Sequence, residues 1–262
     1  MVDARRPAAA DVFYPAVRDE LAGGVQRLLA NAPAAAPLVT GIRGIVAPHG
    51  LYTKAGPVIA AAWARVVPIA ARVRRVVLLG PAHHVPLVGL AAPFADAFAT
   101  PLGRVAVDRI AIETARRHPQ LFVSDVPHEQ EHSLEVHLPF LQSIAPTATI
   151  VPLIVGDATA SETAQVLDLL WDDTTLAVVS TDLSQYYDAA TAQPMDEWTA
   201  RAIEALDGVE LGQEQACGYA ALRGMLAVAR SRGLRAERLA LEHAGEKDEV
   251  VGYGAFALGA AE

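Results

Sequence analysis

Short apolar runs alternate along this chain with longer segments in which apolar residues recur every three or four positions. Runs such as VVLL, ATIVPLIV and TLAVVS are apolar throughout, which indicates strands buried on both faces. The segments between them have the amphipathic spacing of helices. This alternation predicts an α/β fold: a single domain over residues 1–262, with a mostly parallel central sheet covered by helices on both faces.

The boundaries of these elements follow from the apolar periods and from the Gly, Pro, Ser and Asp residues between them. The expected strands are residues 44–47, 76–79, 85–91, 147–155, 176–180, 239–243 and 250–257. The expected helices are residues 18–29, 56–67, 107–117, 133–143, 161–170, 195–206 and 218–231. No composition shift, internal repeat or low-complexity segment divides the chain.

Three of the expected strands run into polar residues that can carry chemistry. His49 follows the run GIVA, His83 follows RVVLLGP, and Asp182 follows TLAVVS. In an open α/β sheet, ligands bind in the crevice beyond the carboxyl ends of the parallel strands, so these side chains are expected to meet there. Imidazole and carboxylate together suit a first-row metal, or a carboxylate that fixes a histidine tautomer. Taken singly, each residue has a simpler explanation, as a turn cap or a partner for a loop carbonyl.

Cys217 directly precedes a helical pattern in the segment EQACGYAALRGMLAVA. A thiol at a helix N-terminus is close to unpaired N–H groups and the positive end of the dipole, so a lowered pKa and a metal-binding thiolate are expected. A small core residue is the alternative, and position alone does not decide between them. As the single cysteine, Cys217 excludes an internal disulfide and fits a reducing compartment.

The segment PHEQEHSLEVHLPFL contains His128, Glu129 and His132 in the HExxH order of zinc proteases. That motif requires an amphipathic helix, but Pro127 directly precedes it and the apolar periodicity starts only at Leu134. A protease is therefore not the favoured interpretation. We interpret Ser133 instead as a helix cap, with three leucines facing the core. The nearby polar residues expected at the rim of the crevice are His132, Glu135 and His137.

Charge and hydropathy exclude several classes of protein. The net charge is -9, and the densest basic cluster, Arg72, Arg74 and Arg75, is too short to follow a phosphate backbone, so no nucleic-acid partner is expected. The N-terminal segment MVDARRPAAADVFYP lacks the apolar part of a secretory signal. No run approaches the roughly 18 to 20 uncharged residues of a membrane span, so a cytoplasmic protein with no membrane partner is expected. The chain has no GxGxxG, P-loop or GxSxG motif to support dinucleotide, P-loop or serine-hydrolase chemistry.

Seven ordered blocks resemble a known family. They are FYP, APHGLYTKAG, LLGPAHH, EHSLEVHLPFL, STDLS, ACG and VVGYGAFAL. Their order and spacing are similar to those of the Memo-like proteins, whose prokaryotic members are called AmmeMemoRadiSam system protein B. The resemblance covers nearly the whole chain and implies a fold like that of the class III extradiol dioxygenases. It also implies redox-metal binding and, as partners, an unknown small molecule or peptide and a radical SAM protein of the same system.

Carried over from this resemblance, the metal ligands fall on His49, His83 and Cys217. Two imidazoles and one thiolate suit iron or copper, with zinc as a further choice, and suit magnesium or calcium poorly. The resemblance also places Asp182 at the family's acidic position. The FYP block departs from the family pattern, because AADVFYP stands where a glycine-containing AGxFYP is usual.

A second departure affects the chemistry. The family has a histidine three residues after Asp182, and this chain has Gln185. An amide does not take up and return a proton near neutral pH, and loss of a general base typically costs about 10² to 10⁴ in rate. His84, His132 and Tyr186 are the substitutes that the chain offers. The expected catalytic group is therefore Asp182, Gln185 and His132.

Two functions from different classes are compatible with these residues. The first is a Memo-like, metal-dependent oxidoreductase or dioxygenase-like enzyme with a site of two histidines and one cysteine in the crevice. The second is a binding module that uses the same crevice for a small anion or a peptide without chemistry. The glutamine at position 185 favours the second. An assembly role beside a radical SAM protein is a third interpretation that the residues do not test.

Overall fold

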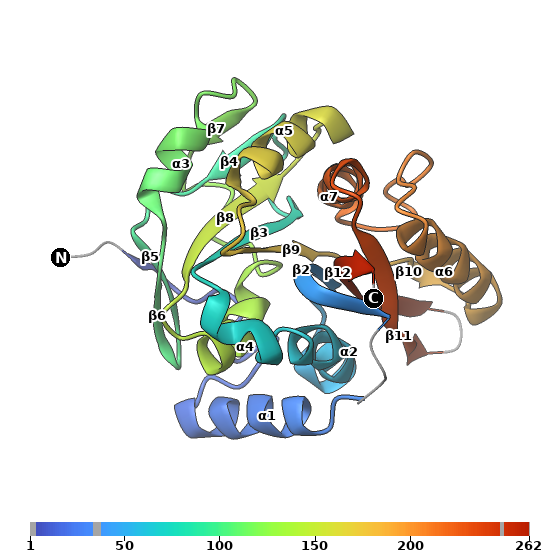
Figure 1. The fold of residues 1–262 in the computed structure, drawn as a ribbon. Helices are drawn as coiled ribbons and strands as arrows, with labels where there is room; N and C mark the ends of the chain where they lie inside the picture. Colours follow the sequence, from blue (N-terminus) through green and yellow to red (C-terminus); the bar gives the residue numbers. More distant parts are fainter. Residues whose placement is uncertain (1–3, 34–37, 247–248, 262) are drawn as a thin grey trace.

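The computed structural model describes residues 4–33, 38–246 and 249–261 (Figure 1). Its helices are α1 (Arg18–Ala30), α2 (Tyr52–Ala64), α3 (Arg109–Ala115), α4 (Leu138–Ile144), α5 (Ala160–Leu170), α6 (Ala189–Glu204) and α7 (Tyr219–Ser231), with 3-10 turns η1 (Val67–Arg72) and η2 (Glu135–His137). Its strands are β1 (Ala4–Arg5), β2 (Val39–Ala47), β3 (Arg75–Pro81), β4 (Leu90–Ala92), β5 (Ala97–Thr100), β6 (Gly103–Ala106), β7 (Leu121–Val123), β8 (Thr149–Val155), β9 (Thr175–Ser180), β10 (Gln185–Tyr187), β11 (Arg235–Glu246) and β12 (Glu249–Ala261).

A nine-stranded sheet forms the centre of the molecule, in the order β10-β12-β2-β9-β3-β8-β4-β7, with β11 also paired to β12. The four strands in its middle, β2, β9, β3 and β8, are parallel. Antiparallel pairs flank them, β12 on β2 and β4 on β8. A small separate sheet contains β1, β5 and β6. Because the parallel strands are neighbours, their carboxyl ends share one edge of the sheet.

Helices cover both faces of this sheet, with α1, α2 and α4 on one side and α5 and α7 on the other (Figure 1). Strands β3, β8 and β9 are buried along almost their whole length, as their apolar runs require, and β2 is buried over its last four residues. The predicted α/β fold with a helix-covered central sheet is therefore confirmed. Within the described ranges, no helix is long and apolar enough to cross a membrane.

Several boundaries differ from the predictions for local reasons. The strand expected at residues 85–91 forms only from Leu90, because Pro86 lacks an N–H and Gly89 has a φ of 84°. The helix expected from residue 195 begins at Ala189, where the Asp188 side chain caps the N–H of Thr191. The short strands β1, β5, β6, β7 and β10 were not predicted, since two to four residues show no clear period.

Candidate metal centre at the strand ends

The parallel strands bring three of the predicted site residues together. His49, Asp182 and His83 each lie two residues beyond the end of β2, β9 and β3, which are adjacent in the sheet. The backbone N–H of His49 donates to Asp182 Oδ1 at 2.9 Å. The rings of His49 and His83 lie with their centroids 5.1 Å apart. These residues therefore share one crevice, where the carboxyl ends of the strands meet.

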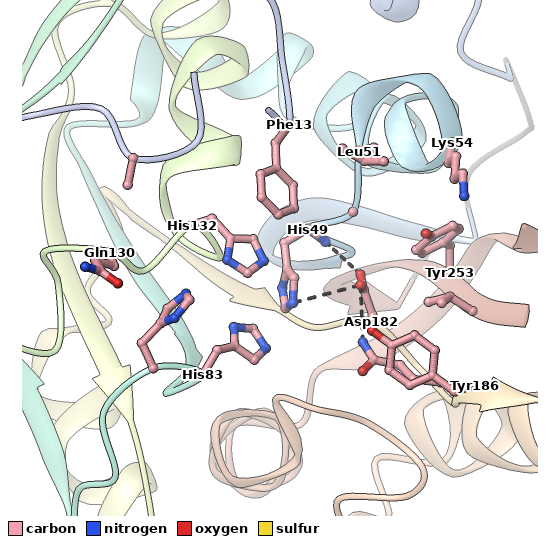
Figure 2. A pocket seen from close by; sticks show the side chains of 15 residues that line it. Phe13, His49, Leu51, Lys54, His83, Gln130, His132, Asp182, Tyr186 and Tyr253 are labelled. Carbon is pink, nitrogen blue, oxygen red and sulfur yellow. Dashed lines mark hydrogen bonds and ion pairs between the residues drawn. The ribbon is translucent and has the colours of Figure 1, made fainter. Parts of the chain in front are cut away.

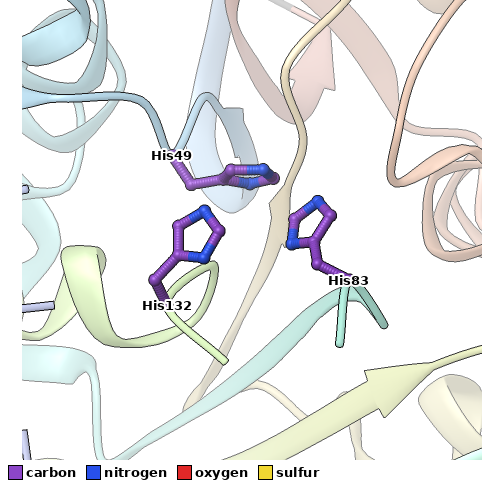
Figure 3. A group of neighbouring side chains, drawn as sticks. All are labelled: His49, His83 and His132. Carbon is purple, nitrogen blue, oxygen red and sulfur yellow. The ribbon is translucent and has the colours of Figure 1, made fainter. Parts of the chain in front are cut away.

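A third imidazole, that of His132, completes a group of metal-binding side chains (Figure 3). One ligand nitrogen from each of His49, His83 and His132 lies within 4.8 Å of the others. The His132 ring is stacked between Phe13, at a centroid distance of 4.1 Å, and His83, at 4.9 Å. This stack fixes His132 beside the two strand-end histidines. The sequence suggested a catalytic role for His132, and its position in this group suits a ligand as well.

Hydrogen bonds determine which nitrogen of His49 is free. Trp63 Nε1 can only donate, so at 3.2 Å it makes His137 Nδ1 an acceptor, and His137 Nε2 carries the proton. His137 Nε2 and His49 Nδ1 then both donate to Ser180 Oγ, at 3.0 and 2.8 Å. The Ser180 hydroxyl donates in turn to the Ser133 carbonyl at 2.7 Å. His49 Nδ1 is therefore protonated, and its Nε2 lone pair is available to a metal.

A buried carboxylate determines which ring nitrogen of His83 is free. Glu131, which is 2% exposed, accepts from the ring Nδ1 of His83 at 2.9 Å and from its backbone N–H at 2.8 Å. Burial acts to raise the pKa of the Glu131 carboxyl, but the hydrogen bonds from His83 and from the Ser133 N–H outweigh it and hold this pKa well below its usual range. An ionised Glu131 leaves His83 Nε2 free. Carboxylate–histidine pairs of this kind commonly orient metal ligands.

The imidazoles of His49, His132 and the neighbouring His137 are uncharged at neutral pH. Burial, reinforced by the neighbouring His83, lowers the pKa of His49 to about 3. Burial also lowers the pKa of His132 to about 4 and that of His137 to about 3, with the His49 ring adding to both effects. Neutral imidazole is the form that binds metal, so His49 and His132 need not first lose a proton.

Cys217 lies at the edge of this group. Its Sγ is 3.5 Å from His49 Nε2 and accepts from the backbone N–H of Asp182 at 3.3 Å. Among the described residues, the set of mutually close ligand atoms contains the three histidines and not this thiol. Cys217 lines a different cavity of about 260 Å³.

The expectation of a lowered thiol pKa is wrong. Burial, reinforced by the charge of Asp182, raises the pKa of Cys217 to about 12. Helix α7 begins only at Tyr219, with Gly218 as its N-cap, so the sulfur is not within the first turn. Without a metal the sulfur is therefore a thiol, and its binding would release a proton.

The crevice in front of the histidines is a cavity of about 890 Å³ (Figure 2). Phe13, His83, Gln130 and His132 line one side of it, and Lys54, Tyr186 and Tyr253 line the other. Asp182 and Gln185 also line this cavity, with Gln185 Nε2 at a long 3.5 Å from Asp182 Oδ2. Burial raises the pKa of Asp182 to about 6, against the opposing hydrogen bond from the His49 N–H.

The HExxH segment is not helical, in agreement with the prediction that it is no protease motif. His128 is buried away from the other histidines, and its Nε2 donates to the Ala91 carbonyl at 3.0 Å. The proposed Ser133 cap is wrong, because Leu134 is the residue before the 3-10 turn and the Ser133 hydroxyl has no partner within the described ranges. The three leucines expected in the core, Leu134, Leu138 and Leu141, are buried.

Glu135, expected at the crevice rim, is fully buried and has a structural role. Its carboxylate accepts from Arg5 and Tyr14 and from the backbone N–H groups of Ala8 and Ala9, the last two at 2.7 and 2.9 Å. These bonds fasten the N-terminal segment that carries Phe13 over His132. No local sequence pattern indicates this buried ion pair.

The fold and this site define an α/β protein with a candidate metal centre at the carboxyl ends of its parallel strands. A family model described as Memo-like protein matches residues 5–257, and the chain belongs to this family. The family resembles the class III extradiol dioxygenases in fold, as expected from the sequence blocks.

Curated relatives and a solved structure agree with this assignment. A MEMO1 family protein of Thermotoga maritima is 32% identical over 280 residues, which cover 95% of this chain and 97% of the relative. A MEMO1 family protein of Thermoplasma acidophilum is 30% identical over 267 residues, covering 95% and 96% of the two chains. The crystal structure of an uncharacterized Escherichia coli K12 protein covers 81% of this chain and 99% of its own, with a TM-score of 0.52 at 14% identity. That likeness concerns the fold alone.

Proposed function

We propose that this protein binds a transition-metal ion in the crevice, through His49 Nε2 and His83 Nε2 with His132 as third ligand. The observation that supports this is the convergence of three imidazole nitrogens within 4.8 Å of one another. The Nδ1 atoms of His49 and His83 are both occupied, by Ser180 and Glu131, so the free nitrogens are available to an ion. Three protein ligands leave a further position open toward the cavity.

The donor set restricts the metal. Imidazole ligands suit zinc, copper, iron and nickel, whereas magnesium and calcium require oxygen ligands. Cys217 is the alternative third ligand, as the family resemblance implies. Distances of about 2.3 Å to sulfur and about 2.1 Å to nitrogen place two ligand atoms roughly 3.5 Å apart in a tetrahedral site. The distance from Cys217 Sγ to His49 Nε2 is 3.5 Å, which is compatible with a shared ion.

The finer proposal is that the protein is a metal-dependent oxidoreductase. A bound iron or copper ion would supply one-electron chemistry and polarise a ligand placed in the crevice. Asp182, which faces the cavity, would accept a hydrogen bond or proton from that ligand. Gln185 would orient the ligand through its amide, without acting as a base.

A non-catalytic binding module is the second candidate function, and Gln185 favours it. The crevice of about 890 Å³ is large enough for a small molecule or one side chain of a peptide. In that function the crevice would hold a small anion or a peptide and no turnover would occur. A radical SAM protein of the same system remains a proposed partner, and co-purification would test it.

Metal titration of purified protein tests the proposal. We expect Zn(II), Fe(II) or Cu(I) to bind in a one-to-one ratio by calorimetry, with affinity lowered at least about 100-fold in His49→Ala. His84→Ala is the matched control, because His84 lines the same cavity and is not in the three-histidine group. Equal affinity in His49→Ala and His84→Ala would overturn the proposal.

Two further variants decide the third ligand. If His132 is a ligand, His132→Ala lowers the affinity for zinc by about the same factor as His49→Ala. If Cys217 is the ligand instead, Cys217→Ser has this effect and the release of one proton on binding is lost.

Turnover is tested separately, by oxygen consumption of the iron-loaded or copper-loaded protein with candidate substrates.

A further inference from the structure

The crevice does not end at the residues opposite the histidines. Lys54, Tyr186, Val251 and Tyr253 line the cavity of about 890 Å³ and also an adjoining cavity of about 540 Å³ beside the β11–β12 hairpin. These four residues, which we call the distal wall, therefore face ligand space on both sides. Figure 2 shows three of them across the crevice from His83 and His132.

Tyr186 has the most unusual conformation in the distal wall. It is the extra residue of a bulge, because Gln185 pairs with Val251 and Tyr187 with the adjacent Val250. Its φ is 64°, in the left-handed region that a bulky residue rarely adopts, and 72% of the residue is exposed. Strained residues and bulges that redirect a side chain are concentrated at functional sites. No packing in the core explains why a tyrosine stands at this position.

The charged residues in and around the distal wall indicate which kind of ligand could bind beside Tyr186. Lys54 is exposed in the first turn of α2, and within the described ranges its ammonium group has no hydrogen bond or ion pair. No arginine lines either cavity in the described part of the chain, whereas the acidic side chains of Asp182, Glu246 and Glu249 do. These carboxylates repel any anion, and they repel a doubly charged phosphate more strongly than a singly charged carboxylate. The paired guanidinium donors that usually hold phosphate do not line the described cavities. One lysine is sufficient for a singly charged carboxylate.

We propose that the distal wall binds the aromatic carboxylate part of the ligand that occupies the crevice, with Lys54 on the carboxylate and Tyr186 against the ring. This proposal rests on the proposed function only in using the same crevice, because the distal wall contains no residue of the histidine group. It names the ligand class: a molecule with a flat aromatic face and a single carboxylate. Tyr253, which is 4% exposed, lines both cavities beside Lys54 and Tyr186.

Three small probes separate charge from shape in metal-free protein. Benzoate has the ring and the charge, benzamide has the ring alone, and cyclohexanecarboxylate has the charge without a flat face. We expect saturable binding of benzoate by NMR titration, with the largest shifts at Lys54 and Tyr186. Lys54→Gln is expected to weaken benzoate about tenfold and to leave benzamide unchanged, and Lys54→Arg to retain benzoate. Tyr186→Leu is expected to weaken benzoate and benzamide about fivefold and cyclohexanecarboxylate less.

The outcomes distinguish this proposal from the metal proposal. Equal binding of benzoate and benzamide, or benzoate binding that Lys54→Gln does not weaken, overturns the distal wall as a carboxylate site. Absence of saturable benzoate binding overturns it as well. Repeating the titration in His49→Ala is expected to give the same benzoate affinity, because the metal group is not involved. Loss of metal binding in that variant with benzoate binding retained would show two independent sites in one crevice.

Discussion

The two ends of the crevice are built on different principles. At the histidine end, His49 is 2% exposed and its Nδ1 and backbone N–H both have defined acceptors, Ser180 and Asp182. At the distal wall, Tyr186 is 72% exposed and Lys54 has no partner in the described part of the chain. Metal ligands require fixed geometry before the ion arrives, whereas a variable ligand requires groups that remain free for it. Hydrogen bonds that hold each ring in place thus mark the first kind of site, and unpaired or strained residues mark the second.

The strongest test of this contrast is the removal of a charge that supports the histidine end. Glu135→Gln leaves the buried Arg5 guanidinium without its carboxylate, and loss of one partner of a buried pair typically costs about 3 to 5 kcal/mol. We expect a loss of at least about 3 kcal/mol in the free energy of unfolding, measured by urea denaturation. The matched control is Glu113→Gln, which removes an exposed pair with Arg116 in α3 and should cost less than about 0.5 kcal/mol. Similar losses in the two variants would contradict the prediction.

Acid should weaken the fold through a histidine outside the crevice, His128. Burial, only partly offset by the hydrogen bond to Ala91, lowers the pKa of His128 to about 4, below the value of 6.5 for an unperturbed histidine. The unfolded chain then binds more protons than the folded one between these two values, so stability is lost as the pH falls from about 6.5 to about 4. His128→Gln cannot take up this proton, and we expect its stability to fall by about 2 to 3 kcal/mol less over that window than that of the parent protein. Urea midpoints across the window measure this, and parallel curves for the two proteins would contradict it.

The next prediction concerns Ser180, whose hydroxyl holds the His49 ring in one tautomer. Ser180→Ala removes the acceptor of His49 Nδ1 and His137 Nε2, so His49 is no longer held in one tautomer. We expect zinc affinity to fall about 10-fold to 100-fold, and nitrogen NMR of the metal-free protein to show a mixture of His49 tautomers. Ser231→Ala is the control, because the Ser231 hydroxyl only bonds the Val228 carbonyl within α7. A single unchanged His49 tautomer in Ser180→Ala would contradict the assigned role, whatever the metal affinity.

The residues of the histidine end differ in how far the sequence predicts them. The sequence predicts that His49, His83 and Asp182 are neighbours in one crevice. Apolar runs predict the three strands, and the carboxyl ends of parallel strands lie at one edge of the sheet. His132 is recognisable as a crevice residue from its neighbours in the chain, yet its stacking against Phe13 and His83 depends on the N-terminal segment. The main-chain architecture is therefore predictable, and the contacts between distant loops are not.

The supporting residues escape prediction for the same reason. Ser180 contacts His49 across 131 residues of sequence, and Glu131 contacts His83 across 48. A serine at the end of a buried strand and a glutamate beside a histidine carry no local pattern that distinguishes them. Lys54 and the bulge at Tyr186 are equally hidden, because the bulge depends on the register of β10 against β12. Pairing register is set by the folded partners, not by either strand alone.

The smallest expected effect is a gain in the stability of the fold, and it concerns the distal wall. Tyr186→Gly removes the side chain from a position whose φ of 64° suits glycine, so relief of the left-handed strain should stabilise the fold by about 0.5 to 1 kcal/mol. The same variant should weaken benzoate binding, since the ring that faces the ligand is gone. Val251→Gly is the matched comparison on β12, where glycine relieves no strain and should destabilise the paired strand. Thermal unfolding and the benzoate titration together measure both effects. Greater stability with weaker binding in Tyr186→Gly would show that Tyr186 destabilises the fold and contributes to ligand binding. Lower stability in this variant would show that Tyr186 is a packing residue, and the contrast between the two ends of the crevice would not hold.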